Sequence, residues 1–278
     1  MNAHASPHPP VAALDAAGWE RFLARSDMRW DVLPRDVDEA PFVGNGRLGA
    51  ILWQDGDGAL RIEVPRCDRD GRKISDSSHF VLAWRGSPPH GSLRLDQWNA
   101  ELRGGLAVGG GDLALRCFVH AELDVIVLRL YGDGAAPDPS WHPDPAGSTR
   151  TYRMPSDPDL VARPPSRWQH VDEIEVSVQE MPAGGLQATA WLCQRDVDGL
   201  TCLISIQRGA QAAELVARAV QQASGAGLAS LATGHRAWWH DFHGKSLLAV
   251  SAPQLASFDW IQMHTWGSAS AGAARSAM

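Results

Sequence analysis

Most of the chain alternates between short apolar runs and turn-forming residues, which is the pattern of β-strands. From Met28 to about Ile206 the runs are separated by clusters of Gly, Pro, Asp and Ser. Many short strands with turn signals between them predict a mainly β protein, a large antiparallel β-sandwich of the supersandwich kind. The predicted strands are Leu48–Trp53, Leu60–Val64, His79–Trp84, Ser92–Leu95, Asn99–Leu102, Leu113–Val119, Val125–Leu130, Glu173–Val178, Gln187–Cys193 and Thr201–Gln207.

Three segments follow a helical period instead. Residues 13–27 place apolar side chains at helical spacing, and we expect a short amphipathic helix there. Residues 212–242 carry an apolar stripe that is interrupted at Gly225–Gly227 and then resumes. Residues 251–266 form a further short helical candidate. The sandwich is therefore expected to lead into a C-terminal helical linker.

Composition shifts suggest the domain organisation. Residues 104–111 contain five glycines and are expected to form a loop, and residues 133–165 are expected to form a long irregular excursion. The low-complexity end is too poor in apolar surface to order itself. We divide the chain into an N-terminal tail with a short helix (1–27), a β-sandwich domain (28–210), a helical linker region (211–266) and a disordered tail (267–278).

Charge and composition narrow the function. The net charge of −7 disfavours nucleic-acid binding, which requires a basic face. The N-terminus has no apolar signal region, and no stretch predicts a transmembrane span, so the chain as written is expected to be cytoplasmic. The 12 Trp residues, against 6 Phe and 2 Tyr, suit stacking on sugar rings, although most are expected to fill the core.

The four cysteines are scattered and form no C-x-x-C pair, which argues against a zinc ribbon or a thioredoxin-type site. Cys193 and Cys202 lie on two predicted strands joined by a turn, where they can face each other. A disulfide is one interpretation, but we expect a pair of buried free thiols.

The segment Pro41–Ala50 contains Gly44, Gly46 and Gly49 in the spacing G-x-G-x-x-G. In a dinucleotide site this pattern follows a hydrophobic strand and opens a helix. Here an acidic, proline-broken stretch precedes it, and a predicted hairpin follows it. We therefore expect a hairpin and no nucleotide.

The same stretch resembles the opening signature of the N-terminal β-domain of glycoside hydrolase family 95, the inverting α-L-fucosidases, and of its uncharacterised relatives. Two downstream stretches extend the resemblance. Trp238–Ser246 resembles the linker after that sandwich, and Phe258–Met263 resembles the first helix leading into the catalytic (α/α) barrel. The stretch Val64–Gly71 departs from the Asn-, Glu- and Trp-containing motif usual in the family, so the resemblance assigns no particular sugar.

The resemblance implies a non-catalytic domain that packs on a barrel missing from this chain and shapes its sugar site. In the family the catalytic groups lie in the barrel, so no catalytic residue is carried over and no cofactor is expected. The expected partners are carbohydrate and the barrel, with no nucleic acid and no membrane. Such hydrolases are commonly periplasmic or secreted, which differs from the location expected of the chain as written.

The candidate substrate-binding residues are Asn45, Arg47 and Trp53. Arg47 suits either a forked hydrogen bond to a sugar or carboxylate, or a structural ion pair with Asp36 or Asp38. Trp53 suits either the core or a sugar platform. The carboxylates near the signature are interpreted as solvated charges: Asp36, Asp38, Glu39, Glu63, Asp68 and Asp70.

Residues 235–243 hold the densest group of imidazoles and carboxylates, namely His235, His240, His243 and Asp241. Tryptophan and phenylalanine side chains interleave with them, which indicates packing against a neighbour. No metal is therefore expected.

Two alternatives remain open. The chain is alternatively a free-standing carbohydrate-binding module, because it combines a sandwich with many tryptophans. A third interpretation is an interaction domain that exposes a Trp238–Trp239 surface.

Overall fold

The computed structural model describes residues 14–67, 73–74, 78–143, 164–181, 184–245 and 253–270. The helices are α1 (Ala16–Leu23), the 3₁₀ helix η2 (Val37–Glu39), α2 (Ala212–Ala226), α3 (Leu228–Gly244) and α4 (Pro253–Ser270). The strands are β1 (Met28–Trp30), β2 (Phe42–Gly44), β3 (Gly49–Gln54), β4 (Leu60–Glu63), β5 (Arg66–Cys67), β6 (Lys73–Ile74), β7 (His79–Ala83), β8 (His90–Asp96), β9 (Glu101–Val108), β10 (Gly111–Val119), β11 (Ile126–Gly132), β12 (Asp138–His142), β13 (Arg167–Val171), β14 (Ile174–Glu180), β15 (Leu186–Asp196) and β16 (Gly199–Arg208).

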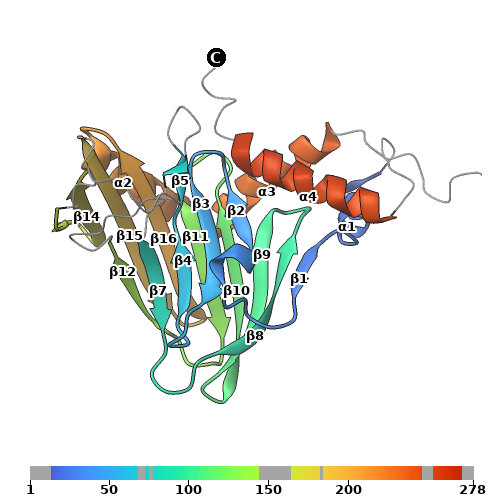
Figure 1. The fold of residues 1–278 in the computed structure, drawn as a ribbon, viewed down its shortest axis with the longest axis horizontal. Helices are drawn as coiled ribbons and strands as arrows, with labels where there is room; N and C mark the ends of the chain where they lie inside the picture. The colour runs from blue at the N-terminus through green and yellow to red at the C-terminus, as the bar shows by residue number, and fades with distance from the viewer. Residues whose placement is uncertain are drawn as a thin grey trace, which may run out of the picture.

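Two antiparallel sheets form the body of the protein (Figure 1). The larger sheet has nine strands in the order β1-β8-β9-β10-β11-β16-β15-β14-β13, and the smaller has five in the order β12-β7-β4-β3-β2. A short two-stranded ribbon pairs β5 with β6. The prediction of a mainly β, antiparallel sandwich is confirmed.

The main core lies between the two sheets and follows from strand alternation. On β10, Leu113, Leu115 and Cys117 point inward and are buried. The residues between them belong to the outer face, because successive side chains of a strand point to opposite faces. The central strand β11 is buried on both sides, as its nearly continuous apolar sequence predicts.

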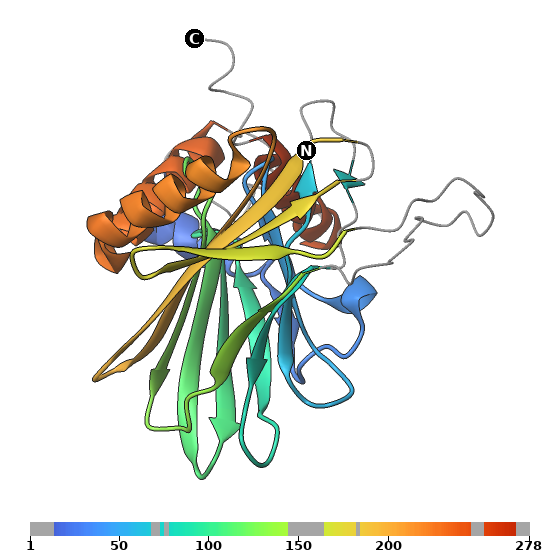
Figure 2. The same cartoon turned by 90° about the vertical axis from the view of Figure 1, so that its left-hand side faces the viewer.

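A second core covers part of the outer face of the nine-stranded sheet. Helix α2 packs there on β14, β15 and β16 through Val216 and Val220, which are fully buried. Figure 2 shows α2 and α3 across the upper part of this face, while the opposite ends of the strands carry no helix.

The glycine signature forms a hairpin between β2 and β3, and a second hairpin follows between β3 and β4. Gly46 has a φ of 82°, which suits a residue without Cβ. A strand, not a helix, follows the glycines, so the structure has no nucleotide-binding βα turn here. The expected hairpin is confirmed.

The structure corrects two expectations about loops. Gly104 and Gly105 lie inside β9 and not in a loop, and only Gly109–Gly110 form the turn. A Cβ on Gly104 would lie 2.8 Å from the carbonyl oxygen of Ser92, so close strand packing selects glycine. The excursion expected over residues 133–165 contains β12, an edge strand that tolerates Pro139, and residues 144–163 of it lie outside the described part.

Sequence reasoning also missed β1, β2 and β13, which are short. A strand was expected to begin at Asn99, but Asn99 and Ala100 lie in a tight turn, in which Ala100 has a φ of 49°. Helix α4 ends at Ser270, four residues beyond Trp266, where the helical pattern was expected to end. Residues 271–278 of the expected tail, and Asp68 and Asp70, lie outside the described residues.

Cys193 and Cys202 form a disulfide between β15 and β16, so the expectation of free thiols is wrong. The two residues are direct cross-strand partners, with their Cα atoms 4.2 Å apart. Cys117 is a buried thiol, and burial raises its pKa to about 12. Among the helices of the described residues, none has both the length and the apolar character that a bilayer span requires.

We expect non-reducing peptide mapping to recover the peptides of Cys193 and Cys202 as one cross-linked species. Replacing both by Ala should lower the free energy of unfolding, because the cross-link restricts the unfolded chain. The loss should be only about 2–3 kcal/mol, because the loop that the disulfide closes is short. Alkylation of both thiols in the unfolded, unreduced protein would contradict the disulfide.

Candidate functional site

The segments that carry the family resemblance meet at one end of the sandwich. Helix α4 crosses the signature hairpin so closely that a Cβ on Gly44 would lie 3.1 Å from the carbonyl oxygen of Ser268. A Cβ on Gly267 would lie 2.5 Å from the Trp239 ring of α3. Glycines on both elements therefore permit a junction of hairpin, α3 and α4, which we treat as the candidate site.

Asn45 is the fixed point of the hairpin turn. It is fully buried, and its Nδ2 donates to the carbonyl oxygens of His120 and Leu123, both at 3.0 Å. Its Oδ1 accepts from the backbone N–H of Arg47 at 3.1 Å and of Leu48 at 2.9 Å. Asn45 thus ties the hairpin to the turn after β10.

Arg47 is placed by the same turn. Its Nε donates to Asp124 Oδ1 at 2.7 Å, with the arginine side chain 30% exposed. Asp124 in turn accepts from Gln207 of β16 at 2.7 Å. The partner of Arg47 is therefore a residue 77 positions away and not Asp36 or Asp38, and Asp36 caps η2 instead.

Trp53 does not converge with the other two predicted residues. Its neighbours Leu52 and Gln54 on β3 are buried, and Trp53 points to the opposite face of the five-stranded sheet. There the guanidinium carbon of Arg61 lies 5.7 Å from the centre of its ring. The hypothesis that Asn45, Arg47 and Trp53 contact a sugar stays a prediction, and it does not describe one common pocket.

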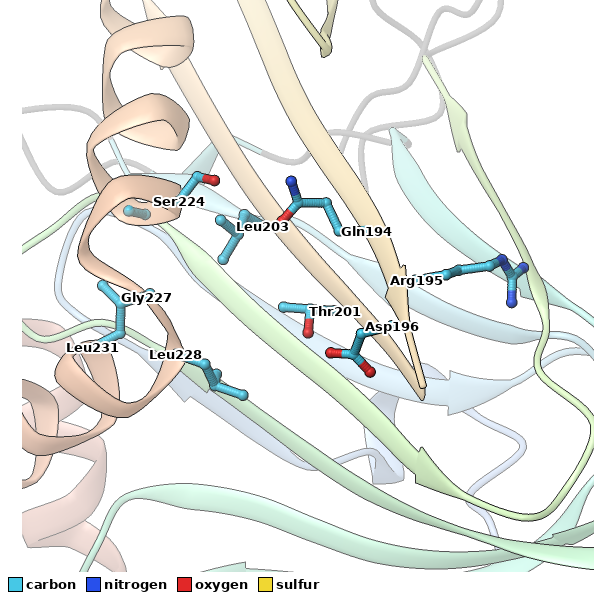
Figure 3. Close-up of a pocket in the computed structure, with 10 residues that line it drawn as sticks. Gln194, Arg195, Asp196, Thr201, Leu203, Ser224, Gly227, Leu228 and Leu231 are labelled. Atoms are coloured by element: carbon cyan, nitrogen blue, oxygen red, sulfur yellow. The ribbon is translucent and has the colours of Figure 1, made fainter. Parts of the chain in front are cut away.

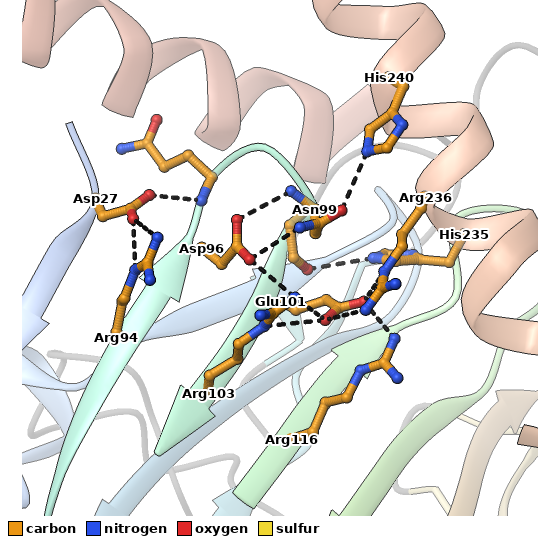
Figure 4. Close-up of polar contacts among 12 residues, drawn as sticks. Asp27, Arg94, Asp96, Asn99, Glu101, Arg103, Arg116, His235, Arg236 and His240 are labelled. Carbon is orange, nitrogen blue, oxygen red and sulfur yellow. Dashed lines mark hydrogen bonds and ion pairs between the residues drawn. The ribbon is translucent and has the colours of Figure 1, made fainter. Parts of the chain in front are cut away.

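The turn between β8 and β9, residues 97–100, anchors α3 to the sheet. His235 Nε2 lies 3.3 Å from the carbonyl oxygen of Ala100, and His243 Nε2 lies 2.9 Å from that of Gln97. His240 Nε2 lies 3.1 Å from Asn99 Oδ1 (Figure 4). The three histidines of the sequence cluster therefore bind one turn.

Aromatic rings reinforce this anchor. Trp98, from the middle of the turn, stacks between His240 of α3, at 3.8 Å between ring centres, and Trp19 of α1, at 5.9 Å. Trp260 of α4 meets the edge of Trp19 at 5.9 Å. Three helices thus pack on one turn of the sheet. Trp239 is fully buried and Trp238 is partly buried, which contradicts the third interpretation, an interaction domain that exposes a Trp238–Trp239 surface.

A buried carboxylate lies directly below the turn. Glu101, the first residue of β9, is fully buried, and three arginines surround it (Figure 4). Arg236 of α3 donates to it at 2.7 Å, Arg103 at 3.1 Å, and Arg116 contacts it from β10. Burial alone would raise the pKa of Glu101, but the hydrogen bonds from Arg236 and Arg116 outweigh burial and lower it.

The buried histidines of this junction are held neutral. Burial lowers the pKa of His235 to about 3, and that of His243 and of His264 on α4 to about 4. Each places Nε2 at a backbone carbonyl, and His264 faces that of Phe42 at 3.4 Å. Their Nδ1 atoms have no hydrogen-bond partner in the described part of the chain. A second proton would therefore be buried without a partner.

This arrangement is suited to holding the helices on the sheet and not to acid–base chemistry. Glu101 is ionised and saturated by arginines, and the buried histidines are neutral and committed to backbone carbonyls. Within the described residues, no group of three or more His, Cys, Asp or Glu side chains could hold a metal ion.

Sequence reasoning found the landmarks of the junction but not its chemistry. It identified the histidine cluster and the packing role of its neighbours. It missed Glu101, Arg116, Arg236 and the turn, because their pairing joins positions up to 135 residues apart. The one local signal that Glu101 is unusual was its position at the start of a strand, directly before the apolar residue Leu102.

No protein-family model matches the sequence, and no curated protein matches it either. Among solved structures, the fold is similar to a putative kojibiose phosphorylase from the human microbiome, with a TM-score of 0.54 and 8% identity. The match covers 82% of this chain but only 36% of that one, so this chain spans about a third of its length. At this identity the likeness establishes the sandwich fold alone.

The buried histidines predict a distinct loss of stability in mild acid. Unfolded histidines take up protons below pH 6.5, whereas His235, His243 and His264 resist protonation in the fold until about pH 4 or below. The stability they contribute is complete above pH 6.5 and is lost as the pH falls towards 4. By pH 5 each should cost about 2 kcal/mol, measurable by denaturant unfolding.

His264→Gln should reduce this pH dependence between 6.5 and 5 by about a third, because His235 and His243 remain; this range lies above the usual titration of carboxylates. His90→Gln, which changes an exposed side chain, serves as the matched control. A stability that is constant from pH 6.5 to 5 would contradict the buried neutral histidines.

Proposed function

We propose that this chain is the non-catalytic sandwich domain of a carbohydrate-active enzyme, and that it packs against a catalytic (α/α) barrel and forms one wall of its sugar site. The fold likeness to part of a putative kojibiose phosphorylase supports the general class. The signature hairpin and the linker-like helices support an α-L-fucosidase-like relative. The described residues contribute no acid–base pair at the junction, which fits a supporting role.

The observation that carries the proposal is a set of three large apolar side chains exposed on one side of α4. Leu255, Phe258 and Trp266 are each about 60% exposed and recur at helical spacing, at i, i+3 and i+11. The opposite face of α4 is seated on the sandwich through Trp260 and His264, which are buried. Asp259 and Gln262 lie on the same side of α4 as the three apolar side chains and are partly exposed, so the surface mixes apolar and polar groups, as protein interfaces commonly do. The buried side of the same helix contacts the hairpin through His264 and Ser268.

One observation favours a second candidate, a free-standing carbohydrate-binding module. Trp168 on the edge strand β13 is 51% exposed and meets the edge of Trp191 at 5.4 Å between ring centres. A supported, exposed tryptophan suits stacking on a sugar ring. Sugar binding that is lost in Trp168→Ala would favour this function over barrel docking.

We expect the isolated chain to show no turnover of aryl α-L-fucosides and no phosphorolysis of kojibiose, because its carboxylate and imidazole groups at the junction are committed to structure. The same preparation should self-associate in sedimentation through α4, and Phe258→Ser with Trp266→Gln should reduce that association. Arg167→Gln, a change on the distant strand β13, is the control. Turnover by the purified chain would refute a non-catalytic role.

A further inference from the structure

A groove lies on the outer face of the nine-stranded sheet, away from α4. Its first part is a hollow of about 460 Å³ where the α2–α3 turn meets β15 and β16. Figure 3 shows Gln194, Asp196 and Thr201 on the strand side of the hollow, with Leu228 and Ser224 on the helix side. Arg195 extends away from it and binds the carbonyl oxygen of Pro137 instead.

The groove continues into a second hollow of about 550 Å³ over β10 and β11, and Leu228 lines both hollows. The floor is a polar row in cross-strand register. Gln194 pairs with Thr201, Thr201 with Arg129, and Arg129 with Arg116. Each hollow falls in the size range of small-molecule sites, about 300–1,000 Å³.

The charges of this floor are already balanced. Arg129 donates two parallel hydrogen bonds of 2.8 Å to Asp196, and a third of 2.9 Å to Thr201. Arg116 contacts the buried Glu101. The floor therefore offers rigid, planar polar groups without a net positive field, which argues against a polyanion.

Three neutral side chains that line the groove have hydrogen-bonding groups available to a ligand. Gln194, Ser224 and Tyr131 form no side-chain hydrogen bond with any described residue. Tyr131 is 46% exposed, so its ring and its hydroxyl both reach a ligand. Leu228 is partly exposed and supplies an apolar patch between these groups, while Leu203 and Leu231 are buried beneath it.

We propose that this groove binds a neutral oligosaccharide. A sugar chain presents hydroxyls in every direction and apolar C–H faces between them. Amides, hydroxyls and a fixed arginine–aspartate pair satisfy the hydroxyls, and the Tyr131 ring and Leu228 meet the C–H faces. Two adjoining open hollows suit several linked residues. The site goes beyond the proposed function, since it lies on another face and needs no docked barrel.

The test is a titration of the full chain by calorimetry and two-dimensional NMR. The probes are maltopentaose, cellopentaose, xylopentaose and 2′-fucosyllactose, with dextran sulfate as the polyanion. We expect at least one neutral probe to bind at millimolar concentrations or below. Tyr131→Ala and Gln194→Ala should each weaken it about tenfold or more, while thermal unfolding stays unchanged.

Matched controls lie on β13. Trp168→Ala removes an exposed aromatic ring and Gln169→Ala removes an exposed amide, and neither should change the affinity. The groove assignment is overturned if no neutral probe binds at millimolar concentration, if dextran sulfate binds more tightly than every neutral probe, or if only Trp168→Ala weakens binding. If the chain shows no turnover and the groove binds no sugar, the groove proposal fails and the proposed function stands. If the chain shows turnover and the groove binds sugar, the proposed function fails and the groove proposal stands.

Discussion

The buried carboxylate of Glu101 is the constraint on which the rest of the structure depends. A fully desolvated charge is tolerated only when opposite charges and hydrogen bonds surround it. Here strands β9 and β10 each supply one arginine and helix α3 supplies another. Removing a partner from such a group typically costs about 3–5 kcal/mol, because the remaining charge is left buried. Arg236 is the one partner of the three that lies outside the sheet, so its pairing with Glu101 ties α3 to the sheet.

Once α3 is held, the other elements follow in order. Its histidines bind the turn at residues 97–100, and the Trp98 ring from that turn seats α1 and α4. Trp239 and Gly267 bring α4 against the signature hairpin, whose glycines leave space for it. The placement of α4 thus follows from one electrostatic anchor, whereas Arg47 is held separately by Asn45 and Asp124. The groove over β11 and β16 depends on the same helix, because Leu228 begins α3.

Sequence reasoning succeeded where the signal was local. Alternating apolar positions and turn residues predicted most long strands, and the helical stripes predicted α1 to α4. It failed where side chains pair across long separations. It did not reveal that Asn45 donates hydrogen bonds to residues 75 and 78 positions further along the chain, and the sugar contact of Asn45 stays a prediction. The glycines at 104–105 were assigned to a loop, because the close approach of β8 that selects glycine is not visible in one strand. The sequence predicted that Cys193 and Cys202 can face each other across two strands, but it did not predict that they are oxidised to a disulfide.

The most direct test of this account is hydrogen exchange of α3 amides in Glu101→Gln. The account predicts that α3 opens about a hundredfold more readily than in the unchanged chain, while the central strands β11 and β16 keep their protection. Glu175→Gln, which alters a surface contact with His170, should leave α3 as it is. Equal protection of α3 in Glu101→Gln and in the unchanged chain would contradict the claim that this carboxylate holds the helices to the sheet.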